Sequence, residues 1–196
     1  MILRGLTMSR SLLTAFVLCA AVAAGPALAD DILDAIEQGR TAYQAGDMAG
    51  AKQSLDTASQ LIAQKNAEGY AALLPEPLSG WQADKAQTSA VGAAMFGGVS
   101  AANRTYTNAK GDTVEVSISG DSALVMQFAP MLNNPAMAGA FGKLIRVGSQ
   151  RAVQNPDGDI MMVVANKFLI NVQGSADAAS KVAYAQAIDV AKLSKM

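Results

Sequence analysis

Apolar and polar positions follow two different rhythms along this chain, and the rhythm changes near residue 75. Before this point, apolar residues recur at intervals of three and four, which predicts helices, at Ala51, Leu55, Ala58 and Ile62. After it, short segments alternate strictly between apolar and polar residues, as in residues 114–119. Such alternation is typical of a strand with one buried and one wet face. The pattern therefore predicts helices first and a sheet afterwards.

Residues 30–72 are predicted to form a helical hairpin. Asp30 and Asp31 can cap its first helix, and Gly46-Asp47 breaks the pattern, with Asp47 as N-cap of the second helix. A Pro-rich linker is expected at residues 73–77, where Pro75-Glu76-Pro77 ends the helical part. Residues 78–196 then form the sheet domain.

The most apolar hairpin of the sequence lies at residues 159–174. The unbroken apolar run Ile160–Val164 favours a central strand covered on both faces, and residues 168–173 alternate in the next strand. A two-residue loop is predicted at Asn166-Lys167, because Asn tolerates the positive φ that such loops need. A helix is expected to follow, with Ser175 as its N-cap.

Other segments complete the predicted sheet. A hairpin is expected at residues 100–108 and 113–119, then a helix that Pro130 kinks or ends, a short turn from Pro135, and strands at residues 143–147 and 150–153. Hairpin connections favour an antiparallel sheet. The expected fold is α+β: an N-terminal helical hairpin followed by an antiparallel β-sheet with helices packed on one face. As a fold analogy, it is similar to the extrinsic photosystem proteins.

Residues 1–29 are typical of a secretory signal peptide. Arg4 and Arg10 make a positive start, residues 12–22 are almost wholly apolar, and Ala27-Leu28-Ala29 fits a cleavage site. We expect cleavage after Ala29 and a periplasmic product, with no transmembrane segment in residues 30–196. An uncleaved membrane anchor is the alternative.

Composition excludes several function classes for residues 30–196. The chain has 15 basic and 16 acidic residues, so removing Arg4 and Arg10 leaves 13 against 16, with no basic patch suited to nucleic acid. It has no His, and its one cysteine is Cys19 in the leader. Ordinary zinc, haem and copper-thiolate sites, a Cys nucleophile and a His base are thereby excluded. We expect no cofactor, no metal and no catalytic residue.

Three local motifs have simpler structural interpretations. Gly120-Asp121-Ser122 resembles the nucleophile block of GDSL-type hydrolases, but that family needs a His that this chain lacks, so a turn and helix cap are favoured. The scattered methionines favour core filling over copper binding. Residues 155–159 favour a turn over a calcium loop, since the later bidentate Glu is missing.

Two apolar loops are the candidate binding surfaces. Residues 91–99 and 130–142 are rich in Gly and Ala, and each carries a Phe, whereas ordinary loops are polar. They either pack on each other or form an exposed patch for a partner or ligand. In the second case the contact residues are Met95, Phe96, Met137 and Phe141.

Two resemblances narrow the picture. Residues 39–58, GRTAYQAGDMAGAKQSLDTA, resemble one tetratricopeptide repeat through Gly39, Gly46, Asp47, Ala51, Leu55 and Ala58. A single unit implies a hairpin that docks on its own domain or on another protein, because repeat arrays need about three units. The segments 73–81, 92–98 and 163–174 resemble an uncharacterised family of small periplasmic proteins of Gram-negative bacteria, which implies a compartment and no activity.

These observations leave three function hypotheses. The first is a non-enzymatic periplasmic binding or interaction module, using the apolar loops and the hairpin to hold an envelope protein or a lipid-like ligand. The second is an envelope enzyme that works with carboxylate, Lys or Tyr chemistry, for which the candidates are Asp84, Glu115, Lys143 and Arg146. The third is a structural or stress-related envelope protein, which predicts neither cleft nor patch.

Overall fold

Two antiparallel helices open the structure. The computed structural model describes residues 27–91, 99–120 and 123–196, and its first helices are α1 (Ala27–Gln44) and α2 (Met48–Ala71). Gly46 turns the chain with a φ of 79°, a conformation that glycine adopts without strain. The Asp47 carboxylate accepts a hydrogen bond from the Gly50 N–H at 2.9 Å, so the predicted N-cap is confirmed.

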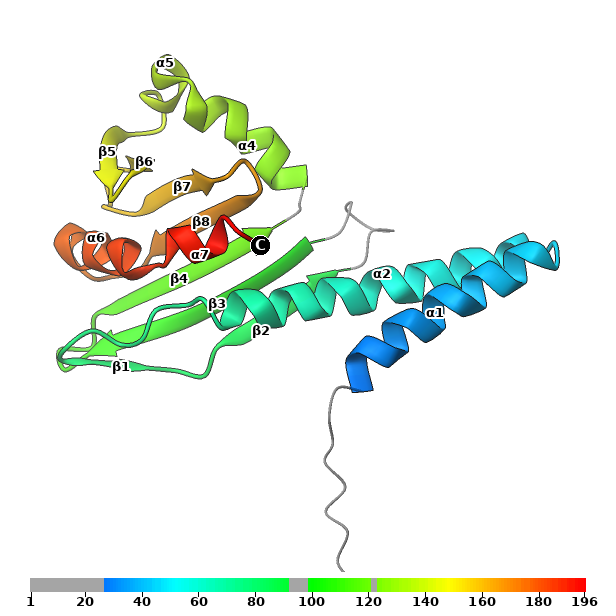
Figure 1. Ribbon diagram of the computed structural model, residues 1–196. Coiled ribbons are helices and arrows are strands. Elements are labelled where there is room, and N and C mark those ends of the chain that lie inside the picture. The colour runs from blue at the N-terminus through cyan, green and yellow to red at the C-terminus, as the bar shows by residue number, and fades with distance from the viewer. Residues whose placement is uncertain (1–26, 92–98, 121–122) are drawn as a thin grey trace, which may run out of the picture.

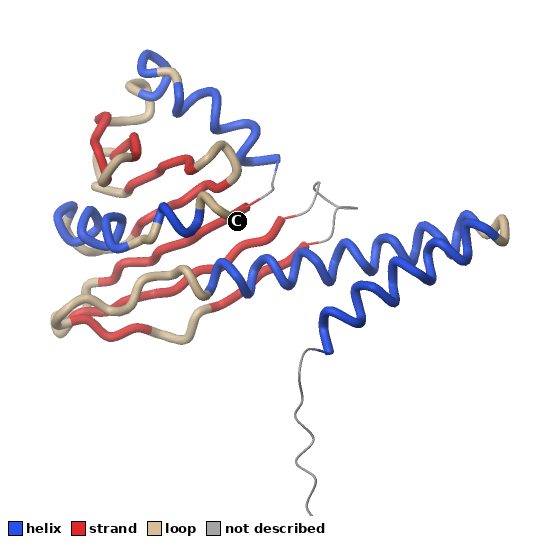
Figure 2. The backbone as a smooth tube through the Cα atoms, viewed as in Figure 1, coloured by secondary structure: helices blue, strands red, loops and turns tan. Residues whose placement is uncertain are grey.

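An antiparallel sheet of eight strands follows the hairpin. The strands are β1 (Trp81–Ala83), β2 (Gln87–Val91), β3 (Val99–Asn108), β4 (Thr113–Gly120), β5 (Lys143–Val147), β6 (Gln150–Gln154), β7 (Ile160–Val164) and β8 (Phe168–Gln173). Their order is β1-β3-β4-β8-β7-β6-β5, and β2 also pairs with β3. The red strands of Figure 2 follow this order across the molecule. The α+β class with an antiparallel sheet is confirmed.

The β7–β8 hairpin is central, as its apolar pattern predicts. Met161 and Val163 on one face of β7 pack against a helix, while Ile160, Met162 and Val164 on the other face are buried. The predicted two-residue loop is wrong by one residue, because Val164 pairs with Phe168 and leaves three residues between the strands. Ala165 joins Asn166 at positive φ, 52° and 55°, and Lys167 N–H closes the turn on the Val164 carbonyl.

Helices lie on both faces of the sheet (Figure 1). The C-terminal half of α2, α6 (Ala178–Ala187) and α7 (Val190–Leu193) pack on one face. The other face carries α4 (Ala123–Asn133), which continues three residues past Pro130, and it is followed by α5 (Pro135–Ala138). The prediction that the helices pack on one face does not hold for α4, which lies on the other. α4 lies there because the alternate face of β6, β7 and β8 is also apolar, through Val153, Met161, Val163 and Leu169.

The N-cap of α6 differs from the prediction. Asp177 caps the helix by accepting a hydrogen bond from the Ser180 N–H at 2.7 Å. Ser175 instead accepts one from the Thr113 N–H at 2.9 Å and so ties the end of β8 to the start of β4. The predicted caps Asp121 and Ser122 of α4 lie outside the described residues.

The hairpin and the sheet share one hydrophobic core. Tyr70 near the end of α2 is buried and meets the ring of Phe168 edge-on, with 5.5 Å between the ring centroids. Residues 73–77 are therefore not a free linker, since Leu73, Leu74 and Pro75 are buried with the sheet residues. The Tyr106 hydroxyl donates a hydrogen bond to the Pro75 carbonyl at 2.5 Å and fixes this segment. Trp81 packs edge-on against Tyr184 in the same cluster, as a core anchor.

Replacing Tyr106 with phenylalanine should lower the free energy of unfolding by about 1 kcal/mol at neutral pH. It should also reduce the further loss of this free energy as the pH rises above 10. Burial raises the pKa of Tyr106 to about 12. In the unfolded chain the phenol ionises near its ordinary value of 10.0, so the native state loses stability as pH rises from 10.0 toward 12. Urea unfolding at neutral pH and at about pH 11 measures both effects.

The matched control for this change is Tyr43→Phe, because Tyr43 is 62% exposed on α1. That variant should leave both quantities unchanged. Some alkaline slope should survive in Tyr106→Phe, since burial also raises the pKa of Tyr184. An alkaline limb identical to that of the parent protein would contradict the assignment to Tyr106.

Candidate functional site

One face of the sheet changes from apolar to polar along a single row of side chains. Strand pairing lines up one residue from each of six neighbouring strands, so that each lies directly opposite the next. From β6 through β7, β8, β4 and β3 to β2, this row consists of Val153, Met161, Asn171, Ser117, Asn103 and Gln87. Opposed residues in a sheet lie close enough for their side chains to act together. The first two members are apolar and the last four carry amides or a hydroxyl, so the row is amphipathic across the strands.

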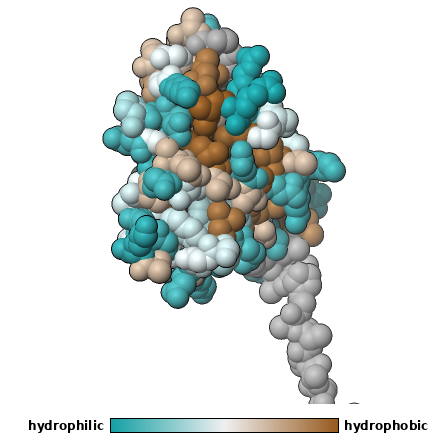
Figure 3. All heavy atoms as spheres, turned by 90° about the vertical axis from the view of Figure 1, so that its left-hand side faces the viewer, coloured by the Kyte–Doolittle hydropathy of each residue, from teal (hydrophilic) through white to brown (hydrophobic). Residues whose placement is uncertain are grey.

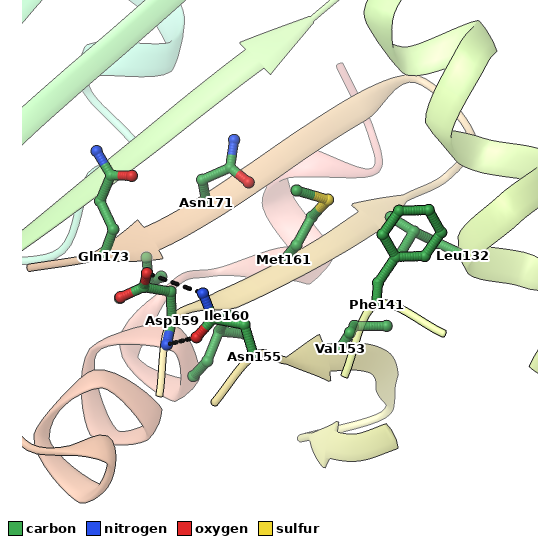
Figure 4. Close-up of a pocket in the computed structure, with 10 residues that line it drawn as sticks. Leu132, Phe141, Val153, Asn155, Asp159, Ile160, Met161, Asn171 and Gln173 are labelled. Carbon is green, nitrogen blue, oxygen red and sulfur yellow. Dashed lines mark hydrogen bonds between the residues drawn. The ribbon is translucent and has the colours of Figure 1, made fainter. Parts of the chain in front are cut away.

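A hollow lies at the apolar end of this row. Its volume is about 310 Å³, at the lower end of the range for small-molecule sites. Leu132 of α4 and Val153 of β6 are buried in its wall, and Phe141 closes it from the segment between α5 and β5. Figure 4 shows the Phe141 ring beside Leu132, with the Met161 thioether along the wall. This end offers an aromatic face and aliphatic groups to a ligand.

The surface around this end of the molecule is also apolar. Figure 3 views the molecule from the side on which Figure 1 places α5, β5 and β6, and an apolar band runs down its upper half between polar side chains. Phe141 is 48% exposed, Met137 47% and Leu144 42%, although a soluble surface seldom groups such large side chains. The hollow therefore opens on a surface that itself favours contact with apolar groups.

The polar wall of the hollow is held by a hydrogen-bonded turn. Asn155 accepts from the Asp159 N–H at 2.8 Å and donates to Asp159 Oδ2 at 3.1 Å (Figure 4). The other carboxylate oxygen accepts a hydrogen bond from Lys181 at 2.6 Å, and Lys181 is only 1% exposed. Burial raises the pKa of Asp159, but the Lys181 and Asn155 hydrogen bonds and the Lys181 charge outweigh it, so the pKa stays below its ordinary value. Asp159 is thus an ionised, fully engaged group, which suits a structural role and not that of a general base.

Two amide side chains face the hollow without such engagement. Asn171 and Gln173 project from β8 to the same side, and Figure 4 shows their amides standing free of the Asn155–Asp159 pair. Within the described residues, neither amide has a hydrogen-bond partner. Each can donate and accept, so they can recognise uncharged polar groups such as hydroxyls and amides.

The polar end of the row forms a second, smaller hollow. It measures about 140 Å³ and is lined by Gln87, Ser89, Asn103 and Ser117, among others. In the part of the chain that the structure describes, the side chains of Asn103, Ser117 and Gln87 make no hydrogen bond to another residue. Asn171 and Ser117 are paired across β8 and β4, so the two hollows continue one surface. An extended ligand can span both.

The predicted contact residues divide into two groups. Phe141 lines the larger hollow, whereas Met137 is exposed on α5 and does not line it. Met95 and Phe96 lie outside the described residues. Whether the two apolar loops pack on each other therefore stays open, and the contact role of all four residues stays a prediction.

The residues considered for enzymatic chemistry are not brought together. Glu115 lies on β4, whereas Lys143 and Arg146 lie on β5, four strands further across the sheet, or about 19 Å at usual strand spacing. Asp84 follows β1 near the opposite edge, where its carbonyl accepts from Arg104. Among the described residues, no group of three His, Cys, Asp or Glu side chains could hold a metal ion.

The amide row is the feature that sequence reasoning did not assemble. Alternation in residues 168–173 already places Asn171 and Gln173 on the face opposite Phe168 and Ile170, and alternation in β4 does the same for Ser117. Their convergence with Asn103 and Gln87 depends on the strand register, which no local pattern carries.

None of the described helices is long and apolar enough to cross a bilayer. Comparisons of the chain with protein-family models, with curated proteins and with solved structures found no match.

Proposed function

We propose that this protein is a non-enzymatic binding protein of the bacterial periplasm, and that its ligand is lipid-like with an uncharged polar part. The apolar part of the ligand lies in the hollow against Phe141, Leu132 and Met161. The polar part lies along Asn171 and Gln173 and continues toward Ser117 and Asn103. The exported location rests on the signal-like residues 1–29 and the expected cleavage after Ala29.

One observation supports this proposal above the others: unpaired amides border an apolar hollow on an otherwise well-paired fold. No buried side-chain nitrogen or oxygen lacks a hydrogen-bond partner in the described parts of the chain. The row of amides is therefore not an accident of poor packing. Apolar pockets with a few convergent polar groups are the usual form of a small-molecule site.

Charge around the hollow favours an uncharged ligand. The Asp159 carboxylate is neutralised by Lys181, and Glu115 lies on the row's face directly opposite Gln173. An anionic group beside Gln173 would meet this carboxylate, whereas the cations Arg151 and Arg146 lie on β6 and β5, toward the apolar end of the row. Neutral hydroxyl or amide groups gain hydrogen bonds without that repulsion.

The test uses an alkyl glucoside and an alkyl sulfate of equal chain length as probes, both below their micelle concentrations. Isothermal titration calorimetry should detect the glucoside, and the alkyl sulfate should bind at least tenfold more weakly. Phe141→Ser should weaken glucoside binding by about ten- to a hundredfold, because it removes an aromatic side chain from the apolar end. Asn171→Leu should weaken it by about tenfold through lost hydrogen bonds.

Met126→Ser is the matched control for Phe141→Ser. Met126 is 77% exposed on α4 and does not line the hollow, so this change should leave glucoside binding as it is. Equal losses in the control and in Phe141→Ser would place binding elsewhere on the surface. Preference for the alkyl sulfate would contradict the uncharged ligand class, and absence of binding to both probes would overturn the lipid-like ligand.

A further inference from the structure

The outer surface of the helical hairpin carries a line of large apolar side chains. On α2, Met48, Leu55 and Ile62 recur every seven residues and are 61%, 53% and 43% exposed. On α1, Ile36 and Tyr43 are also seven apart and are 42% and 62% exposed. Residues seven apart differ by only about 20° around a helix, so each helix presents one continuous apolar line.

Small residues hold the two helices together and leave these large ones outside. Beside the line, the buried residues are Ala35 and Gly39 on α1 and Ala51 and Ala58 on α2, and Ala63, Ala67 and Tyr70 are buried further along α2. A Cβ added at Gly39 would lie 3.1 Å from Cγ of Leu55, so the helices approach closely at this point. Leu55 lies over Gly39 and is still 53% exposed, so the small residues at the contact leave much of its side chain uncovered.

The spacing on α2 is that of a helix built to pack in a bundle. Positions 48, 51, 55, 58 and 62 alternate intervals of three and four, the a/d pattern of coiled coils. α1 covers the small members of this pattern, and the large members stay exposed. The hairpin also projects away from the sheet, with the sheet packed only on the C-terminal half of α2 (Figure 1). Further helices can therefore reach the line.

Area and charge together indicate what covers it. With Leu33, which is 64% exposed, the large apolar side chains of the hairpin present on the order of 600 Å², close to the 800 Å² or so that each partner contributes to a standard interface. Beside the middle of this line Glu37 pairs with Arg40 and Lys52 with Asp56, while Asp31, Asp34 and Asp47 are exposed nearer the ends of α1. These two pairs neutralise the charges at the middle of the surface, so this part can oppose a rotated copy of itself.

We propose that two copies of this chain associate through their α1–α2 hairpins to form a four-helix bundle, with the two sheets outside it. Met48, Leu55 and Ile62 of one copy pack against the hairpin of the other. The arrangement is two-fold symmetric, because the same surface serves both copies. The association needs neither the hollow on the sheet nor its ligand. A failure of the proposed ligand binding would therefore leave the proposed dimer untouched, and the reverse also holds.

The test is sedimentation equilibrium on the protein purified from the periplasm of cells that express the full chain. We expect a dimer at micromolar concentration. The double variant Ile36→Glu/Tyr43→Glu should weaken the dimer by at least a hundredfold while its circular dichroism stays helical. The matched control is Gln53→Glu/Gln60→Glu, which adds the same charges, also seven residues apart, on the opposite and exposed side of α2. The control should remain dimeric.

A parent protein that is monomeric up to about 100 µM overturns the proposal, whatever the variants do. So does a dimer that Ile36→Glu/Tyr43→Glu leaves intact, or one that both double variants weaken equally. If the charged double variant does not fold, Tyr43→Ser replaces it, since Tyr43 is largely exposed, and a dimer unchanged by that variant and by Met48→Ser likewise overturns the proposal.

Discussion

Alanine in place of Gly174 is expected to destabilise the fold by more than about 3 kcal/mol, the largest effect of any single change considered for this protein. Gly174 directly follows β8 and has a φ of 135°, a backbone conformation that alanine rarely adopts. A Cβ at this position would lie 2.3 Å from the carbonyl oxygen of Thr113 and 2.9 Å from its carbon. Both are backbone atoms at the start of β4, so no side chain can move aside to make room.

Gly111→Ala separates the two causes of this loss. Gly111 has a φ of 87°, but an added Cβ would meet nothing within 4 Å. Its cost should be limited to backbone strain, about 1 kcal/mol. Urea unfolding of both variants gives the difference, which measures the close approach of β8 to β4. Equal costs for the two variants would show that the contact with Thr113 relaxes freely.

Lys181→Met is expected to cost about 2 kcal/mol at neutral pH, because it removes the ammonium donor from two acceptors, one of them a charged carboxylate. Lys181 on α6 donates to the Asp157 carbonyl at 2.9 Å as well as to the Asp159 carboxylate, and so binds the turn before β7 to the helix. Methionine can occupy the space of the aliphatic stem but offers no donor. Lys192→Met, an exposed change on α7, is the control and should be neutral.

The pH dependence of this loss follows from the lowered pKa of Asp159. A carboxyl group whose folded pKa lies below its ordinary value of 3.8 stabilises the fold above that value and loses this contribution as pH falls through the folded pKa. The difference in unfolding free energy between the parent protein and Lys181→Met should therefore be largest near pH 7 and shrink below about pH 4. Asp159→Asn combined with Lys181→Met should cost less than the sum of the two single changes. Strict additivity, or a difference that grows in acid, would contradict this account.

Strand positions were the part of the fold most accessible from sequence. Alternation located β4 and β8, and apolar runs located β7, because these patterns record local burial. The sequence of β7 also implies the position of α4. Both faces of this strand are apolar, so a second element must pack on the face that the main core does not bury. The observed helix supplies that cover through Val125 and Leu132. The N-cap of α6 was missed because Ser175 and Asp177 are both good caps, and the pairing of Ser175 with Thr113 is a contact across 62 residues.

The candidate site was accessible only in its separate parts. Phe141 stood out because its loop is apolar, and Asn171 and Gln173 stood out as the polar side of an otherwise apolar strand. Their proximity depends on the pairing of Asn171 with Met161 on one side and with Ser117 on the other. These residues are distant in the sequence, and register is fixed by the sum of many pairings. Local periodicity therefore predicts which face of its own strand each residue of the row occupies, but not which residues lie opposite one another.

The strand order has a consequence for solubility. β5 ends the sheet, and among the described strands none pairs with its outer side, so its free backbone groups could template the addition of another chain. Lys143 and Arg146 are exposed on this strand, and Arg146 lies directly opposite the exposed Arg151 of β6. Two such edges meeting in solution would bring like charges together. The cationic rim thus protects the protein from edge-to-edge aggregation, and this protection weakens as salt screens the charges.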